Sequence, residues 1–452
     1  MRLLKIKPFK LLDNWGVRGA ITERVTFSSG YHTLRLGDVL NRVKNAVVIE
    51  DDKTYEAIKV KYYNGGVESR GKYLGKDIKS RHQFRVSANQ MVVSKIDARN
   101  GAIGIIPLHL NDAIITNNFI VYDVDLTKAL PKFLVLLLTS QTMMKKIADD
   151  SSGATRRIYL QEDKFLSESI ALPTLADQRT LVEVYEEKVE EAVRTRDFLN
   201  RHFVKAKQDI ETKLKIQYQT NKLSKNLLSS IPLSELARWD VGYYKQHSVL
   251  KSDYPLSLLA DCIDRMMVDV DNQGLRINAE NVAESCLYIG MDSIEKGIGV
   301  TKSDCFLNAR EVKGDMIRVP KDYFIFGKLR PYLNKFWLNK DEERQYTCSS
   351  EFFVFHLNDT FIKEYFEAVL FGDIVKRQVE TITSGARMPR IKEQDLMGVF
   401  IPVPSKQVQQ EVARIYADYM KEKIQCERLA EEALYEARDH FDKVLFNGLK
   451  IE

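Results

Sequence analysis

The chain has 452 residues, which is long for one ordinary domain and predicts two or three. A hydrophobic fraction of 44% is enough for ordinary cores and excludes wholesale disorder. With 68 Lys and Arg against 63 Asp and Glu, the chain is only mildly basic. Such a balance permits a nucleic-acid partner, provided that the cations gather on one surface.

Cysteine usage and hydropathy bear on the compartment of the protein. The five cysteines are odd in number and form no Cys-x-x-Cys pair, which disfavours a zinc site or a disulfide framework. The first ten residues are too basic for a signal peptide, and no stretch approaches the ~18 apolar residues of a membrane span. We therefore expect a soluble, cytoplasmic protein with no membrane segment.

After a lead-in of about 30 residues, the pattern up to residue 172 is mixed. Short apolar runs alternate with Gly, Asn and Asp turns, which is typical of strands. The runs are Ala46–Ile49, Met91–Val93, Ile103–Ile106 and Ile114–Tyr122. Only Pro131–Ile147 has the plain pattern of a helix. The fold class predicted for this region is α+β with a β-rich core.

From residue 174 the period changes to alternating steps of three and four. Apolar residues occupy every position of this stripe except Arg196: Val182, Tyr185, Val189, Ala192, Leu199, Phe203, Ala206 and Ile210. At about 1.5 Å per residue, the predicted helix is roughly 50 Å long or more. The chain ends on a second stripe: Val408, Val412, Ile415, Tyr419, Glu422, Cys426, Leu429 and Ala433.

One stripe alone would fit a helix that lies on its own domain. Two matched stripes of equal length each offer the other a partner, so we predict that the helices pair as an antiparallel coiled coil. The predicted segments are a mixed domain at residues 1–172, a long helix at 173–222, a second mixed domain at 223–402 and a second long helix at 403–452.

The two halves of the chain repeat each other at a constant offset. A proline, Pro173 or Pro404, precedes each predicted long helix. Near these prolines the matched residues lie about 231 to 232 positions apart, and farther upstream they lie about 233 positions apart. The matched pairs are Lys95–Arg99 with Lys328–Tyr332, Thr116–Tyr122 with Ser349–Phe355, Ser152–Ala154 with Ser384–Ala386, Leu172-Pro173 with Val403-Pro404, and Gln178 with Gln409. Chance matches would not keep one offset, so we predict a duplicated protein with an internal pseudo-two-fold.

Catalytic motifs are missing. Gly66–Tyr73 has the spacing of a phosphate-binding loop, but Tyr73 stands where a Ser or Thr must bind magnesium, and we interpret the stretch as a β-hairpin loop. No Asn-Pro-Pro-Tyr or Asp-Pro-Pro-Tyr stretch is present to hold a flipped adenine. Glu186 and Lys188 resemble the tail of a metal-nuclease motif but lie on the predicted helix. We predict a non-catalytic protein without a metal site or cofactor of its own.

Each mixed domain carries a cationic loop with hydrogen-bonding side chains, and the Ser-Gly-Ala segments add further arginines. Arg can read guanine, Asn can read adenine, and Lys or Tyr can hold phosphate. The candidate DNA-binding residues are Lys95, Asp97, Arg99, Asn100, Arg156 and Arg157 in the first half, and Lys328, Arg330, Tyr332, Asn334, Lys335, Arg387 and Arg390 in the second. A solvated surface loop remains the alternative for each one taken singly.

With SKIDARNGAIG, FGKLRPYLNK, SGATRRI, LPTLADQ and IPVPSKQVQQ in their places, the chain resembles the specificity subunit of type I restriction-modification systems over nearly its whole length. The family commonly has Pro-x-x-Glu-Gln at the start of the long helix. Asp177-Gln178 keeps the acidic residue, whereas Val408-Gln409 does not, which predicts a weaker cap on the second helix.

The resemblance implies that each mixed domain is a target-recognition domain for one half of a split sequence in double-stranded DNA. The paired helices would then be a spacer that fixes the gap. It also implies partners, namely two copies of an adenine methyltransferase that bring S-adenosylmethionine, and a motor nuclease subunit in some assemblies. Two alternatives stay open: an enzyme with degenerate motifs, and a coiled-coil scaffold that binds proteins without reading DNA sequence.

Overall fold

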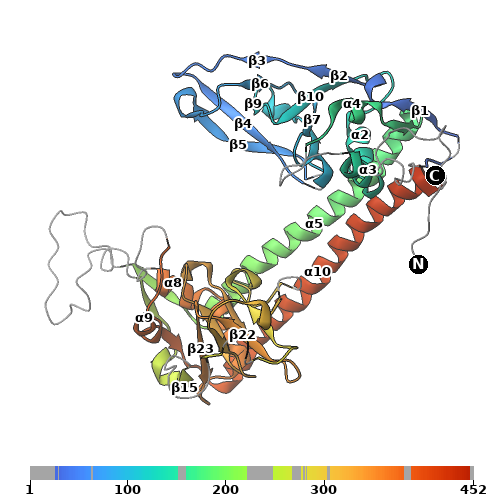
Figure 1. Cartoon of the computed structure of the whole chain (residues 1–452). Coiled ribbons are helices and arrows are strands. Elements are labelled where there is room, and N and C mark those ends of the chain that lie inside the picture. The colour runs from blue at the N-terminus through green and yellow to red at the C-terminus, as the bar shows by residue number, and fades with distance from the viewer. Residues whose placement is uncertain are drawn as a thin grey trace. The chain divides into compact units, whose positions relative to one another are not determined.

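The computed structural model describes residues 26–28, 30–62, 65–150, 159–220, 248–266, 276–277, 280, 282–302, 306–380 and 388–447. Two compact units make up the chain (Figure 1). Unit 1 comprises Met1–Thr195 with Arg428–Glu452, and unit 2 comprises Arg196–Glu427. Within the described ranges, no helix is long and apolar enough to cross a membrane.

In its described residues, unit 1 has a four-stranded sheet, a five-stranded sheet, one two-stranded pair and three short α-helices. The four-stranded sheet has the order β2 (Leu40–Val43), β10 (Phe119–Val124), β7 (Met91–Ser94), β8 (Ile103–Ile105). The five-stranded sheet has the order β3 (Ala46–Val47), β6 (Gln83–Arg85), β9 (Ile114–Thr116), β4 (Thr54–Val60), β5 (Val67–Leu74). Strands β1 (His32–Arg35) and β11 (Ser169–Leu172) pair separately, and the helices are α2 (Pro131–Leu138), α3 (Gln141–Asp150) and α4 (Glu162–Ser167).

Unit 2 repeats this plan. Its four-stranded sheet has the order β15 (Ile263–Met266), β23 (Phe352–Leu357), β20 (Phe324–Gly327), β21 (Phe336–Leu338). Its five-stranded sheet has the order β16 (Arg276–Ile277), β19 (Met316–Arg318), β22 (Tyr346–Ser349), β17 (Leu287–Ile289), β18 (Leu307–Asn308). The remaining pairs are β14 (Leu256–Leu258) with β24 (Phe400–Pro402) and β12 (Gln217–Thr220) with β13 (Ser248–Lys251), and the helices are α7 (Lys363–Phe371), α8 (Ile374–Glu380) and α9 (Glu393–Met397).

The two units share their topology strand by strand. Each five-stranded sheet contains one parallel pair, β4 with β9 and β17 with β22, at the same place in the strand order. Single backbone bonds repeat as well: the amide of Lys95 donates to the carbonyl of Asn118 at 2.8 Å, and that of Lys328 donates to Glu351 at 2.8 Å. The predicted duplication is therefore confirmed at the level of topology.

Each unit has its main core between the four-stranded sheet and the short helices. In unit 1, α2 is almost wholly buried, and its Phe133 ring lies 5.7 Å from that of Phe441. In unit 2, the ring of Phe324 makes an edge contact with Phe366 of α7 at 5.1 Å. Aromatic side chains such as these bury large apolar areas and contribute much of the stability of a core.

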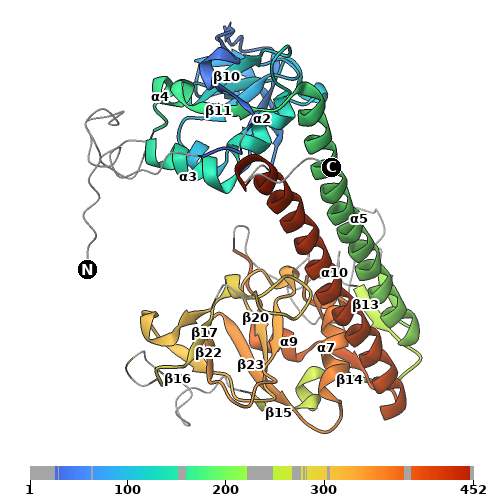
Figure 2. The same ribbon diagram turned by 90° about the vertical axis from the view of Figure 1, so that its right-hand side faces the viewer.

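The two predicted long helices are present as α5 (Leu175–Lys213) and α10 (Lys406–Asn447), of 39 and 42 residues. Within unit 1 they lie side by side, with Ala192 packed among Ala430 and Ala433, and the Lys188 ammonium 3.0 Å from the Glu436 carboxylate (Figure 2). Within unit 2, Phe203 lies 5.7 Å from Tyr419, and Lys213 pairs with Glu411. In each unit, the residue numbers on α5 increase along the contact while those on α10 decrease. The two helices are therefore antiparallel within each unit.

Three expectations need correction. Leu429 of the predicted α10 stripe is 43% exposed, and its neighbour Ala430 is buried instead. The single helix predicted over Pro131–Ile147 is two helices, because the Thr139 hydroxyl donates to the carbonyl of Val135 at 2.7 Å and Ser140 then caps α3. The predicted hairpin exists, but residues 67–74 form strand β5 rather than its loop.

Candidate nucleic-acid interface

The first candidate loop joins β7 to β8 through a short 3-10 turn, η4 (Ala98–Asn100). The turn ends on Gly101, whose φ of +72° lies in the left-handed region that glycine adopts most easily. Buried Ala98 fixes the base of the turn, while Asp97, Arg99 and Asn100 are partly exposed. The loop is thus held from below and presents its polar side chains outward.

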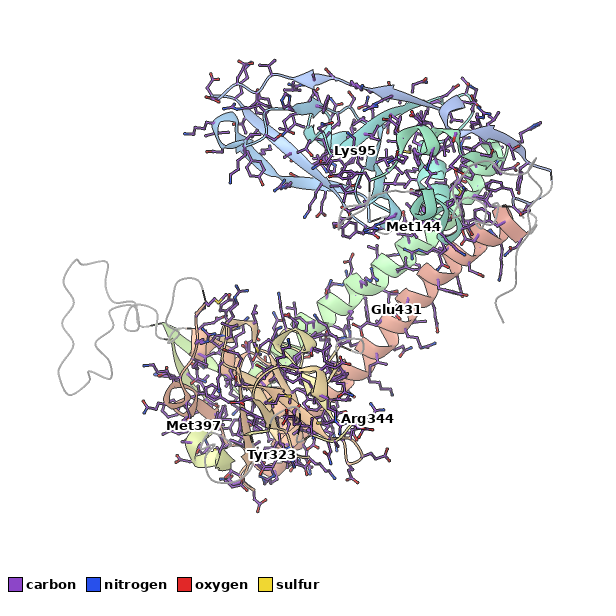
Figure 3. All side chains as sticks on the ribbon, viewed as in Figure 1. Lys95, Met144, Tyr323, Arg344, Met397 and Glu431 are labelled. Carbon is purple, nitrogen blue, oxygen red and sulfur yellow. The ribbon has the colours of Figure 1, made fainter. Side chains whose placement is uncertain are left out.

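Lys95, labelled in Figure 3, stands at the start of this loop, and Arg42 and Lys44 lie near enough to act on its charge. Its ammonium donates to the Asn117 side chain at 3.0 Å. Burial lowers the pKa of Lys95, and the positive charges of Arg42 and Lys44 lower it further, against the opposing effect of Glu162. Arg42 already forms an ion pair with Glu162, so an anion bound beside Lys95 would compete with that carboxylate for Arg42.

Unit 2 carries the matching loop between β20 and β21, with the 3-10 turn η11 (Pro331–Leu333) at its tip. The Lys328 ammonium donates to the carbonyl of Ser350 at 2.7 Å and lies 5.0 Å from the centre of the Phe353 ring. Arg330 is exposed and has a left-handed φ of +49°, and Tyr332 is 38% exposed. An arginine and a tyrosine side by side can contact base edges and phosphate.

Arg390 lies beside this loop. Residues Leu329 and Arg390 form an isolated β-bridge, and the amide of Arg330 donates to the carbonyl of Pro389 at 2.7 Å. The Arg390 guanidinium grips Glu351 with two hydrogen bonds of 3.1 and 3.0 Å, which raises the pKa of Arg390. A phosphate would have to displace Glu351 to bind this arginine in the same bidentate way.

Two candidates of the second loop are buried, Asn334 at 1% and Lys335 at 7% exposure. The Asn334 amide donates to the carbonyl of Leu370 at 2.6 Å, and the Lys335 ammonium donates to the carbonyl of Met291. Burial lowers the pKa of Lys335. The charge of Asp292 opposes this effect, and the positive charges of Lys302 and Lys296 add to it. Asn334 and Lys335 therefore support the loop from beneath in this conformation.

Three candidates, Arg156, Arg157 and Arg387, lie outside the described residues. The residues that follow these segments do reach the loops. The amide of Leu160 donates to the carbonyl of Lys95 at 2.7 Å, and that of Ile391 donates to Lys328 at 3.1 Å. In each unit, a residue shortly after the Ser-Gly-Ala segment is therefore bonded to the candidate loop.

Four cations near the loops were missed from the sequence: Arg42, Lys44, Lys296 and Lys302. The first two come from the edge of β2 and the last two from the connection between β17 and β18, each about 30 or more residues from the loop concerned. Only the strand order brings them near Lys95 and Lys335. No signal in the sequence marks them out from other surface cations.

The two loops lie at matched positions of two related sheets, and each carries cationic side chains. Among the residues described, no group of three or more His, Cys, Asp or Glu side chains could hold a metal ion. The described cysteines Cys262, Cys286, Cys348 and Cys426 are free thiols. The two loops supply hydrogen-bond donors and positive charge, the groups that proteins use to contact nucleic-acid phosphates and base edges.

One family model matches part of the sequence. Residues 28–187 are similar to the type I restriction modification DNA specificity domain. The matched region covers nearly all of the first mixed domain and the start of α5, in agreement with the resemblance seen in the sequence.

Three solved structures are similar to the chain, each at 14% identity. The first is the crystal structure of the HsdS subunit from Thermoanaerobacter tengcongensis, with a TM-score of 0.39 over 93% of this chain and 98% of that chain. The second is the crystal structure of the type I restriction-modification system S subunit from M. genitalium, with a TM-score of 0.41 over 95% of this chain and 98% of that chain. The third, described as the structural basis of complex assembly and conformational transition of the type I R-M system, has a TM-score of 0.49 over 91% of this chain and 98% of that chain. No curated protein sequence matches the chain.

Proposed function

We propose that the chain is the DNA sequence-recognition subunit of a type I restriction-modification complex, and that each unit reads one part of a bipartite target. One observation carries the proposal: unit 2 repeats the topology of the specificity domain in unit 1 and has a cationic loop at the matched position. A chain with two such units can read two half-sites. Because the side chains of the two loops differ, we expect the half-sites to differ in sequence.

Within each loop we assign roles by exposure. Arg99, Asn100 and Arg330 are the candidate base readers, since Arg pairs with guanine and Asn with adenine. Lys95, Lys328 and Tyr332 are the candidate phosphate contacts. Asp97, Arg156, Arg157, Arg387 and Arg390 complete the proposed DNA-binding set, and Asn334 and Lys335 serve it as supports. Salt will weaken this binding because phosphate contacts release counterions.

The long helices have two proposed tasks. As an antiparallel coiled coil, they would relate the two units by a pseudo-two-fold and set the gap between the half-sites. They would also bind two adenine methyltransferase subunits, which bring S-adenosylmethionine, and in some assemblies a motor nuclease would join. The exposed apolar side chains on these helices support protein partners: Val193, Val204, Ile424, Leu429 and Tyr435. The cytoplasm, where DNA is found in bacteria, is the proposed location.

The decisive experiment is to co-express the chain with the methyltransferase encoded beside it and to map adenine methylation across the host genome by single-molecule sequencing. We expect a two-part motif with a fixed gap of unspecified bases. A complex that forms without methylating DNA would contradict sequence recognition by these units. If DNA is bound without sequence preference, or no complex forms, a protein-binding scaffold becomes the better description.

A further inference from the structure

Backbone strain gathers at the second recognition loop. Among the residues described, seven that are not glycine have positive φ, and three of them belong to one set of contacts: Arg330 at +49°, Asn334 at +48° and Asp373 at +62°. Left-handed backbone is unfavourable for L-residues, although Asn and Asp tolerate it better than most. Such strain persists only where the surroundings hold it in place, and it concentrates at functional sites.

A chain of buried polar contacts holds this loop on α5. The Asn334 amide donates to the carbonyl of Leu370 at 2.6 Å and to the Asp373 carboxylate at 3.4 Å. The other oxygen of Asp373 lies 2.8 Å from the Lys207 ammonium, and the two side chains are only 18% and 15% exposed. Three elements far apart in sequence, namely η11, the start of α8 and α5, are joined in this way.

The Lys207 ammonium is fixed by aromatic rings as well as by its carboxylate. It lies 4.3 Å from the centre of the Phe203 ring and 5.3 Å from that of Phe371. Burial lowers the pKa of Lys207, and Asp373 opposes that effect. A buried ion pair is a poor way to gain stability, because an apolar pair of similar volume often stabilises as well or better. Its better attested use is to specify one arrangement of the elements that it joins.

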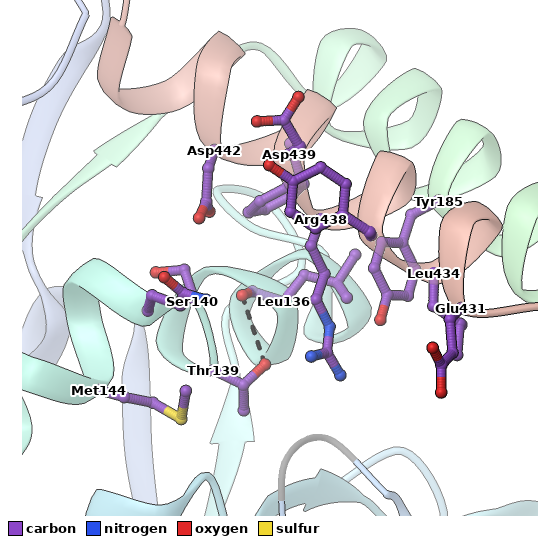
Figure 4. A pocket seen from close by; sticks show the side chains of 13 residues that line it. Leu136, Thr139, Ser140, Met144, Tyr185, Glu431, Leu434, Arg438, Asp439 and Asp442 are labelled. Carbon is purple, nitrogen blue, oxygen red and sulfur yellow. Dashed lines mark hydrogen bonds between the residues drawn. The ribbon is translucent and has the colours of Figure 1, made fainter. Parts of the chain in front are cut away.

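Unit 1 shares only one left-handed position with this arrangement, since Asp97, which stands opposite Arg330, has a φ of −112°. Gly101 replaces Asn334 in the left-handed position, and the offsets of the repeat place Ser140 opposite Asp373 and Arg438 opposite Lys207. Ser140 and Arg438 both line an open hollow of about 330 Å³ between α3 and the C-terminal part of α10 (Figure 4). Ser140 and Arg438 cannot repeat the ion pair of Lys207 with Asp373, because a serine hydroxyl carries no charge.

We propose that Lys207, Asp373 and Asn334 form a positioning network that fixes Arg330 and Tyr332 against the second half-site, an inference that rests on the proposed function. These three residues do not touch DNA themselves. They hold the turn η11 to α5, the helix that would also set the spacing, so the second unit presents its reading side chains in one orientation. Rigid presentation of this kind favours discrimination between bases, because a loosely held side chain can adapt to the wrong one.

The test uses the complex of the full chain with the co-expressed adenine methyltransferase and compares methylation motifs across the host genome. The variants are Lys207→Met, which keeps the length of the side chain and removes its charge, and Asn334→Gly, which copies the residue of the first half. Lys205→Met is the control, since Lys205 lies on the same helix with an exposed side chain. Arg99→Ala and Arg330→Ala establish which half of the motif each unit reads.

We expect both network variants to relax the half-site assigned to unit 2 on the order of tenfold in base discrimination, the lower range for one good base contact. The other half-site and the control should match the wild type. A network with a merely structural role would lower methylation at all sites equally and leave the motif unchanged, which would overturn the proposal. If Lys207→Met fails to fold, as judged by thermal unfolding, Asn334→Gly decides by the same criterion. A wild-type complex without any bipartite motif would refute the proposed function itself.

Discussion

At the scale of single residues, the matched glutamines Gln178 and Gln409 explain why each long helix begins where it does. Both are almost fully buried, at 0% and 1% exposure. The Gln178 side chain accepts from the amide of Leu130 at 2.9 Å and donates to the carbonyls of Lys128 and Pro173 at 3.0 and 2.9 Å. Gln409 makes the three equivalent bonds at 2.9, 3.1 and 3.1 Å. Each glutamine therefore ties a helix start to the loop before α2 or α7.

Replacing Gln409 with Met should destabilise the chain by about 2–4 kcal/mol, because a side chain of similar size would remove the bonds to the Ile362 amide and the Pro404 carbonyl, while the Thr360 carbonyl keeps only Lys406 as a donor. Chemical denaturation followed by circular dichroism would measure the change. The adjacent Gln410→Met provides a control, since Gln410 is exposed and its loss should cost less than about 0.5 kcal/mol. Equal effects of the two substitutions would show that the three bonds contribute little.

Asp442 on α10 predicts a dependence of stability on pH. Burial and, to a lesser extent, the nearby Asp439 raise its pKa to about 6 against the opposing effect of Arg438. In the unfolded chain this carboxyl has its ordinary pKa, so the folded state binds more protons between about pH 4 and pH 6. The contribution of Asp442 to stability must then fall as pH rises through that range, by on the order of 1–3 kcal/mol in total.

Asp442→Asn should therefore be more stable than the wild type at pH 8, and the difference should shrink toward pH 4. Denaturation midpoints at several pH values would measure it. Asp418→Asn is a matched control, because Asp418 lies exposed on the same helix and should show no such trend. A difference between Asp442→Asn and the wild type that stays constant with pH would contradict the assignment.

At the scale of elements, the sequence predicted both long helices, but it did not predict correctly which residues of α10 are buried. Eight apolar positions in regular steps outweigh any single exception on α5. On α10, Lys423 is 5% exposed, since Glu295 from another element lies 3.4 Å from its ammonium. Hydropathy does not predict that a lysine is buried beside a distant glutamate. The predicted stripe therefore included Leu429, whereas the buried positions of α10 include Ala430 instead.

The contrast between Ala430 and Leu429 can be tested directly. Ala430→Leu should destabilise the chain by about 1–3 kcal/mol, because the larger side chain must fit against Ala192 where α5 and α10 approach closely. Leu429→Ala should change the free energy of unfolding by less than about 0.5 kcal/mol, since that side chain is 43% exposed. Thermal or chemical unfolding would distinguish the two, and the reverse order of effects would restore the stripe predicted from sequence.

The sheets show what a single sequence leaves open. Individual strands follow from apolar runs, although the run Ile114–Tyr122 is two strands, β9 and β10, separated by the turn at Asn117 and Asn118. The strand orders and the parallel pairs do not follow, because they depend on contacts between residues far apart in the chain. The set of residues near the candidate loops also depends on the strand order, which the sequence does not reveal. Its loops could be found by matching the two halves, whereas Arg42 and Lys296 could not.

At the scale of the whole molecule, duplication supplies two related surfaces that have since diverged. Where the first unit has Asn118, the second has Glu351, and that carboxylate holds Arg390. The cap of the long helix differs too: Thr174 and Asp177 bond reciprocally at 2.8 and 3.2 Å, whereas Ser405 only accepts from Val408 at 3.4 Å. The shared topology keeps both units compatible with one spacer, and the differences allow each unit its own half-site.

The proposed spacer makes a quantitative prediction about the gap between half-sites. Helices α5 and α10 each have residues in both units, so an equal insertion in the two helices at the boundary of the units should lengthen the proposed spacer without altering either unit. One heptad adds about 10 Å at 1.5 Å per residue and nearly preserves the facing of the stripes. At about 3.4 Å per base pair, the gap should grow by roughly three base pairs.

The insertion would be placed between Thr195 and Arg196 on α5 and between Glu427 and Arg428 on α10, and the methylation motif of the complex would report the gap. Both half-sites should keep their sequences, because no recognition loop is changed. An insertion of the heptad in α5 alone is the control, since unequal helices put the stripes out of register and should abolish methylation. Unchanged spacing with both insertions in place would mean that the helices do not act as the ruler, even if each unit still reads its own half-site.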